Sequence, residues 1–157
     1  MKNPLPSTHL EAWRNYYVSF WRVSAAIEAD LAAAGLPSLA WYNALYELYL
    51  APERRLRMSE LARGALLSRS GLTRLVDRLE EEKLIARHTC AADGRVQYAE
   101  LTEQGVAVLR KIWVVYRAGI ARYFGAHLSE AEAKGIAESF GRVVAAAHER
   151  LKAGPAA

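Results

Sequence analysis

Residues 69–82 read RSGLTRLVDRLEEE. The aliphatic side chains in this stretch recur at positions i, i+3, i+4 and i+7, which places them on one face of an α-helix. They are Leu72, Leu75, Val76 and Leu79. The opposite face begins with hydroxyl and arginine side chains, which can reach base edges and phosphates, and its carboxylates come later. A recognition helix reads DNA with its N-terminal half, so the pattern favours such a helix, although an ordinary solvated helix shares it.

A hairpin signal follows this helix. Asp93-Gly94 lies between two strand-like runs, Arg87–Cys90 and Val96–Leu101, and an Asp-Gly pair in that position indicates a tight β-hairpin. Arg95 would then lie at the tip, where it can enter a narrow minor groove, whose negative potential attracts arginine. Asp93 either pairs with a nearby arginine or only forms the turn. A helix pair followed by a basic hairpin is the order of a winged helix, which strengthens the DNA-binding interpretation.

More helices are predicted on both sides of this unit. Upstream they cover about 8–34, 39–50 and 60–65, and downstream about 103–126 and a final segment. The predicted N-caps are Ser38, Ser59, Thr102 and Ser129, the last in a capping box with Glu132. The expected fold class is therefore mainly α: a winged helix-turn-helix of about six helices with a two- or three-stranded β wing. A strand of one to three residues before Met58 is expected to pair with the wing.

The net charge of +4 is concentrated in one stretch. From Arg54 to Arg95 there are ten basic and six acidic residues, whereas the rest of the chain has eleven of each. A local basic excess fits a phosphate-backbone partner, although +4 is also an ordinary surface charge. No apolar run approaches the roughly 20 residues that cross a bilayer, the first seven residues lack an apolar signal core, and a single cysteine forms no intrachain disulfide. We therefore expect a cytoplasmic protein without a membrane partner.

The central residues resemble those of the MarR (multiple antibiotic resistance regulator) family. The resemblance rests on LA at 61–62, LSRSGLTRLVDRLE at 67–80, LIAR at 84–87, DGR at 93–95 and LTEQG at 101–105. The start of the last helix, LSEAE at 128–132, fits as well. The chain departs from the family at Lys83, where a helix-ending glycine is usual; lysine can adopt that turn at some cost.

This resemblance implies a single MarR-type module over 1–157. Residues 54–101 would form the winged helix-turn-helix lobe, and 8–34 with 103–153 a helical dimerisation lobe. It implies a homodimer on a near-palindromic operator in double-stranded DNA. In many such proteins a small aromatic or anionic effector loosens DNA binding. The apolar seams of the first and last helices have too few partners within one chain, which independently indicates dimerisation.

Two sets of candidate site residues follow. The residues expected to contact DNA are Arg69, Ser70, Thr73, Arg74, Arg78, Asp93 and Arg95. The residues of a possible effector pocket are Tyr17, Trp21, Trp41 and Tyr42, near the junction of the first two helices. Aromatic stripes of this kind are more often core or dimer interface than ligand site.

The leading functional interpretation is a repressor released by a small molecule. The alternatives are a winged-helix regulator with no small-molecule switch and a protein-interaction module that has lost DNA binding. The presence of Ser70, Thr73, Arg74 and Arg95 argues against the last. The histidines show no metal-ligand spacing, and there is no phosphate-cradling loop or Gly-x-Ser-x-Gly elbow. We therefore expect no metal, no cofactor and no enzymatic activity. Cys90 could sense oxidants, but a structural or incidental role is the more common one.

Overall fold

The structure is a computed structural model that describes residues 5–65, 69–89 and 96–152 of the 157-residue chain. Within these ranges it contains α1 (Ser7–Ala33), α2 (Leu39–Leu50), β1 (Arg55–Arg57), α3 (Met58–Gly64), α4 (Arg69–Glu81), β2 (Ile85–Thr89), β3 (Gln97–Leu101), α5 (Glu103–Tyr123) and α6 (Glu130–Lys152). Single turns of 3-10 helix lie at Pro52–Arg54 and Gly125–His127. The mainly helical fold with a small wing is as predicted, and no helix in these ranges is both long and apolar enough to span a bilayer.

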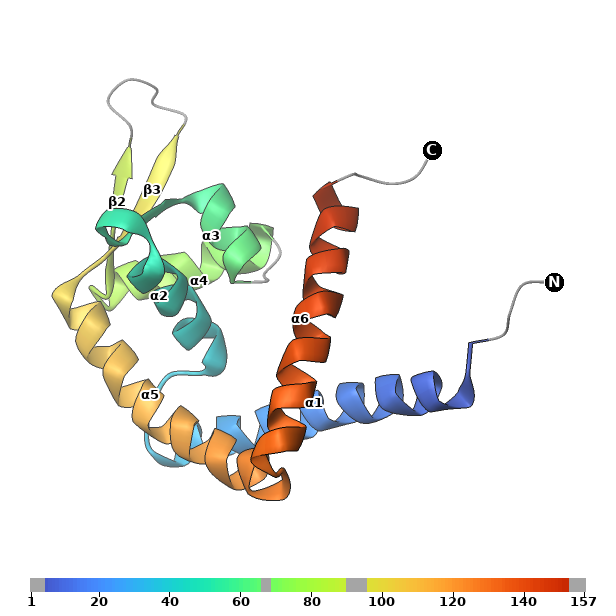
Figure 1. The fold of residues 1–157 in the computed structure, drawn as a ribbon. Coiled ribbons are helices and arrows are strands. Elements are labelled where there is room, and N and C mark those ends of the chain that lie inside the picture. Colours follow the sequence, from blue (N-terminus) through green and yellow to red (C-terminus); the bar gives the residue numbers. More distant parts are fainter. Residues whose placement is uncertain (1–4, 66–68, 90–95, 153–157) are drawn as a thin grey trace.

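The helices and the sheet form one lobe with two long arms. In Figure 1, α2, α3, α4 and the sheet gather at one end, and α5 leads from the sheet to α1. From the far end of α5, α6 turns back and stands apart from the lobe. The core lies where α2, α4, the sheet and the first half of α5 meet, and all four residues of the predicted α4 stripe are buried there.

The sheet has three antiparallel strands in the order β1-β3-β2. The short strand expected before Met58 is β1, and it pairs with β3 through Leu56 and Ala99. The predicted boundaries of the other strands were wrong by one or two residues. β2 begins at Ile85 rather than Arg87, because Ile85 is buried and pairs with Leu101 as soon as the helix ends. Cys90 lies outside the described residues.

The turn from α4 into β2 takes the tight form that helices use to end. Lys83 has φ +58°, and the Leu84 N–H donates to the Leu79 carbonyl oxygen at 2.8 Å. This is the Schellman arrangement, which normally has glycine at the left-handed position. The lysine therefore fills the expected glycine position in the left-handed conformation, as the sequence analysis allowed.

The start of α5 is fixed against this turn. The Gly105 N–H donates to the Thr102 hydroxyl oxygen at 3.0 Å, which confirms the predicted N-cap. The Thr102 hydroxyl lies within hydrogen-bond distance of the carbonyl oxygens of Lys83 and Leu84, at 2.8 and 3.0 Å. A β-carbon on Gly105 would lie 2.2 Å from the Leu84 carbonyl oxygen, so only glycine fits there. The end of α4, the start of β2 and the start of α5 consequently meet at one junction.

The other predicted caps had mixed outcomes. The Ser129–Glu132 capping box is present, with the Ser129 N–H donating to the Glu132 carboxylate at 2.8 Å. Ser38 precedes α2 as predicted, but its side chain makes no capping bond; the Leu39 N–H donates to the Glu28 carboxylate of α1 instead. The Ser59 prediction was wrong, because α3 already begins at Met58. The helix 103–126 was predicted too long, because α5 ends at Tyr123.

Candidate nucleic-acid interface

The exposed face of α4 carries two arginines that are available to a partner. Thr73, Arg74, Asp77 and Arg78 are exposed, opposite the buried stripe. Within the described ranges neither Arg74 nor Arg78 has an ion-pair partner, whereas Arg54 is held by Glu103 at 2.7 Å. A guanidinium without a protein carboxylate keeps all five donors for another acceptor. The exposed face of α4 therefore carries two guanidiniums that no carboxylate among the described residues neutralises.

The remaining predicted DNA contacts are only partly visible. Arg69 and Ser70 lie in the first turn of α4, as predicted. In a recognition helix, this N-terminal end is the one that enters the major groove. Asp93 and Arg95 lie outside the described residues. The strands that carry this hairpin, β2 and β3, lie beside α4 in the same lobe (Figure 1).

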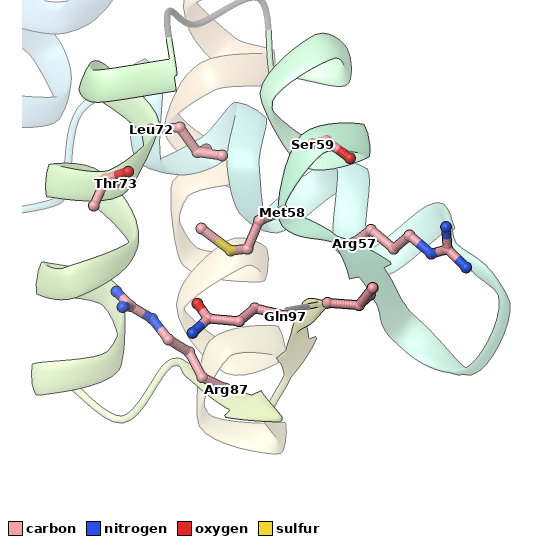
Figure 2. A pocket seen from close by; sticks show the side chains of 8 residues that line it. Arg57, Met58, Ser59, Leu72, Thr73, Arg87 and Gln97 are labelled. Carbon is pink, nitrogen blue, oxygen red and sulfur yellow. The ribbon is translucent and has the colours of Figure 1, made fainter. Parts of the chain in front are cut away.

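A cavity of about 410 Å³ separates α4 from the strands of the wing. Its lining comes from all three strands or the residue beside them and from α3 and α4, and consists of Arg57, Met58, Ser59, Leu72, Thr73, Arg87, Val96 and Gln97. Figure 2 shows Arg87 and Gln97 reaching from the strands towards α4, while Arg57 points away from it. Arg87 joins β2 to α4 across this space through Asp77 and Glu80.

The outer face of the sheet adds arginines that the sequence analysis did not assign to the site. Arg55 and Arg57 alternate with Leu56 along β1, so both lie on the face opposite the core. Their guanidinium carbons lie 5.4 and 5.8 Å from the ring centre of Tyr98 on β3, within cation–π range. The alternating RLR pattern could have revealed this surface before the structure did.

The four predicted effector residues do not gather into one pocket. Tyr17 and Trp21 belong to an aromatic cluster on α1, where their side chains remain more than half exposed. Tyr42 belongs to a second cluster on α2 and α5, together with Tyr46, Trp113 and Tyr116. Trp41 is partly buried against the core. Among the described residues no ring contact joins the two clusters. Tyr42 is the member of the four that lines a groove between α2 and α5 in the described part of the chain.

That hollow is a groove of about 330 Å³ between α2 and α5. It is lined by Tyr42, Tyr46, Tyr49, Leu109, Arg110 and Trp113. The Tyr42 ring lies nearly parallel to those of Tyr46 and Trp113, with centroids 5.5 and 6.1 Å apart. Burial, followed by the neighbouring tyrosines, raises the pKa of Tyr42 to about 12, so its hydroxyl keeps its proton and can donate a hydrogen bond. Flat apolar walls with one guanidinium suit a planar aromatic anion.

Known proteins share this arrangement of helices and strands. A model described as the MarR family matches residues 34–96, which hold α2 and most of the winged unit. The structure of Sco3205 from Streptomyces coelicolor, a MarR family transcriptional regulator in complex with DNA, is 30% identical, with a TM-score of 0.79 over 92% of this chain and 90% of that one. AbsC from the same organism, a MarR family transcriptional regulator, is 29% identical with a TM-score of 0.79, covering 95% and 99%.

A more distant structure shares the fold. BpsR from Bordetella bronchiseptica is 17% identical, with a TM-score of 0.75 over 85% of this chain and 98% of that one. The DNA binding of that protein is regulated by 6-hydroxynicotinic acid. The long helical arms match along with the winged lobe, since these coverages include nearly the whole chain.

Proposed function

Because the chain belongs to the MarR family of transcriptional regulators, we propose that it binds double-stranded DNA as a homodimer and represses transcription until a small molecule releases it. The operator is a near-palindrome, since two copies of α4 related by a twofold axis require two matching half-sites. The protein works in the compartment that holds the chromosome.

The observation that carries this proposal is the exposed face of α4. Arg74 and Arg78 lie one turn apart, on the face of α4 opposite the aliphatic stripe, whose side chains are all buried in the core. They are guanidiniums without a carboxylate partner in the described part of the chain. Further arginines, Arg55 and Arg57, lie on β1 of the sheet in the same lobe. Arginine can form two parallel hydrogen bonds with guanine in the major groove, so this face can read bases as well as bind phosphates.

Selection of duplexes from a random pool tests the DNA-binding part. The parent protein should enrich a near-palindromic sequence, and binding should be weaker on a scrambled duplex of the same composition. Arg117, exposed on α5 and distant from α4 in sequence, supplies the control. Arg78→Ala should weaken binding to the enriched duplex while Arg117→Ala leaves it unchanged. Enrichment of no sequence, or equal effects of the two substitutions, would favour a module that has lost DNA binding.

The groove between α2 and α5 is the site that we assign to the effector. It is lined by aromatic rings that a planar ligand can stack on, and Arg110 on its rim has no ion-pair partner within the described ranges. Its position couples it to the wing, because α2 leads into β1 and α5 begins directly after β3. A ligand that separates α2 from α5 would therefore shift paired strands of one sheet, and with them the geometry of the lobe.

Titration calorimetry with benzoate and phenol tests this assignment. Both compounds offer a ring, but only benzoate carries the charge that Arg110 would bind. Benzoate should bind the parent more tightly than phenol and lower its DNA affinity, and Arg110→Met should remove the preference. Arg117→Met is the control. If neither compound alters DNA binding, the regulator with no small-molecule switch becomes the better description.

A further inference from the structure

One arginine of the wing is bound to the recognition helix on both sides of its guanidinium. Arg87 Nη2 donates to Asp77 Oδ1, and its Nε lies 3.1 Å from Glu80 Oε2. Asp77 and Glu80 are three residues apart on α4, so they present their carboxylates on the same side of the helix. We call these three residues, Arg87, Asp77 and Glu80, the Arg87 clamp.

The clamp lies beside a cavity of the lobe. The cavity of about 410 Å³ lies between α4 and the strands, and Arg87 forms part of its wall. The turn at Lys83 ties Leu84, the residue before β2, to the end of α4. Three residues further along the chain, the ion pairs of Arg87 join β2 to the same helix.

Arg87 itself is poorly placed to contact DNA. Its side chain is only 25% exposed, whereas those of Asp77 and Glu80 are 49% and 44% exposed. The buried Nε has no hydrogen bond, although Glu80 lies close enough for charge pairing. A guanidinium between two carboxylates also offers a phosphate little attraction, since the group of three carries a net charge of −1. Its geometry suits holding two elements together.

We propose that Arg87 is a positioning residue that sets the separation between the recognition helix and the wing. This separation determines how far apart, along the duplex, the major-groove bases read by the helix and the minor-groove site bound by the wing must lie. This rests on the proposed DNA-binding function and adds a determinant of specificity to it. The helix and the wing must bind the same duplex at the same time. With a fixed separation, the base preference of the helix and the groove-shape preference of the wing must both be met at one spacing.

The decisive variant removes the clamp without changing the local charge. Arg87→Met alone would leave two carboxylates near the DNA and weaken binding to any duplex. Combining Arg87→Met with Asp77→Asn removes one charge of each sign and keeps the net charge of the group at −1. The matched control is Arg122→Met with Asp30→Asn, which removes another Arg–Asp pair, with an N···O distance of 3.8 Å, between α5 and α1.

The readout is the base preference of each variant, obtained by selection from a random duplex pool and by titration at two salt concentrations. The clamp-free double variant should keep its preference at the positions contacted by α4 and lose its preference at the flanking positions. Its affinity for the parent's enriched duplex should fall about tenfold, while binding to scrambled DNA and the salt slope stay unchanged. The control should match the parent. Arg87→Lys should be intermediate, since an ammonium lacks the planar fork that contacts two carboxylates.

Two results would overturn the proposal. An unchanged flanking preference in the clamp-free variant would show that the separation is set elsewhere. Equal losses on enriched and scrambled DNA, with a lower salt slope, would show that Arg87 contacts phosphate directly.

A DNA-free measurement keeps this test separate from the proposed function. Amide hydrogen exchange across β2 should quicken in the clamp-free variant and not in the control, because the strand loses its tie to α4. If the parent enriches no sequence, the proposed function fails while the exchange experiment still tests the clamp. Glu80→Gln, which keeps the Asp77 pair, serves if the double variant does not fold, and it should show the same changes to a smaller degree. Unchanged exchange in both variants would overturn the clamp.

Discussion

Lys83 holds a backbone conformation that lysine rarely adopts. Its φ of +58° ends α4, and a left-handed residue with a β-carbon costs about 1 kcal/mol or more. Lys83→Gly should therefore raise the free energy of unfolding by roughly 0.5–1 kcal/mol, measured by urea denaturation. Gly35, at φ +64° after α1, is the reverse control, and Gly35→Ala should destabilise by a similar amount. A lower stability for Lys83→Gly would mean that the lysine side chain stabilises the fold by more than its left-handed backbone conformation destabilises it.

Arg74 and Arg95 should respond differently to truncation. Arg74 lies on the exposed face of α4, so Arg74→Ala should cost ~1–3 kcal/mol on the operator and relax the preference at one base pair per half-site. Arg95 is predicted to reach the minor groove. Arg95→Ala should lower the salt slope by about one charge per subunit, and the loss of affinity should be largest where the sequence that flanks the operator is A·T-rich. Titrations on enriched and scrambled duplexes measure both. Parent-like binding by both folded variants would refute these groove assignments.

At the scale of elements, the capping box at the start of α6 should make stability depend on pH. Hydrogen bonds from the Ser129 hydroxyl and then from its backbone N–H lower the pKa of the Glu132 carboxyl below its usual 4.5. Because the folded pKa lies below the unfolded one, the cap contributes fully above the unfolded pKa and is lost as pH falls through the folded pKa.

Glu132→Gln should therefore lower stability at neutral pH, and its difference from the parent should shrink in acid. Unfolding curves at several pH values measure this. Glu138→Gln, an exposed substitution further along the same helix, is the control and should follow the parent throughout. A difference that does not depend on pH would mean that the amide caps α6 as well as the carboxylate does.

The elements could be predicted where the signal is local. The period of α4, the Thr102 cap and the Ser129–Glu132 box each depend on residues within one or two turns, and all three were found. The Ser59 cap failed because Glu60 accepts the Arg57 N–H and starts α3 earlier. The predicted effector pocket shares Tyr42 with the aromatic groove but not Arg110, because the groove requires knowing that Arg110 of α5 faces α2. Pairing of distant helices is a property of packing, which the spacing along one helix does not reveal.

At the scale of the whole molecule, α1 and α6 each carry a long apolar surface that is exposed in the single chain. Among the α6 side chains that the structure describes none is buried, and Phe140 and Val144 are exposed. A second copy is the partner we expect, so Phe140→Glu or Val144→Asp should shift the protein from dimer to monomer in analytical ultracentrifugation. Operator binding should fall with it, because paired half-sites require both lobes.

Ser139→Asp is the control for this prediction. It adds a carboxylate beside Arg142 on the same helix, next to Phe140 in sequence, and should leave the dimer intact. A parent protein that sediments as a monomer at micromolar concentration would refute the dimer. Dissociation by Ser139→Asp as well would mean that any charge on α6 is disruptive.

The separation of the aromatic residues into two clusters has a spectroscopic consequence. Of the four tryptophans, Trp13 and Trp21 lie on the exposed part of α1, and Trp113 lines the groove between α2 and α5. Indole emission moves to shorter wavelength when water is excluded and is quenched when a ring stacks on it. Dilution of the unlabelled protein should therefore red-shift the emission of Trp13 and Trp21 as subunits part. A stacking ligand should instead quench Trp113 and lower the emission without that red shift, so the kind of spectral change distinguishes assembly from occupancy of the groove.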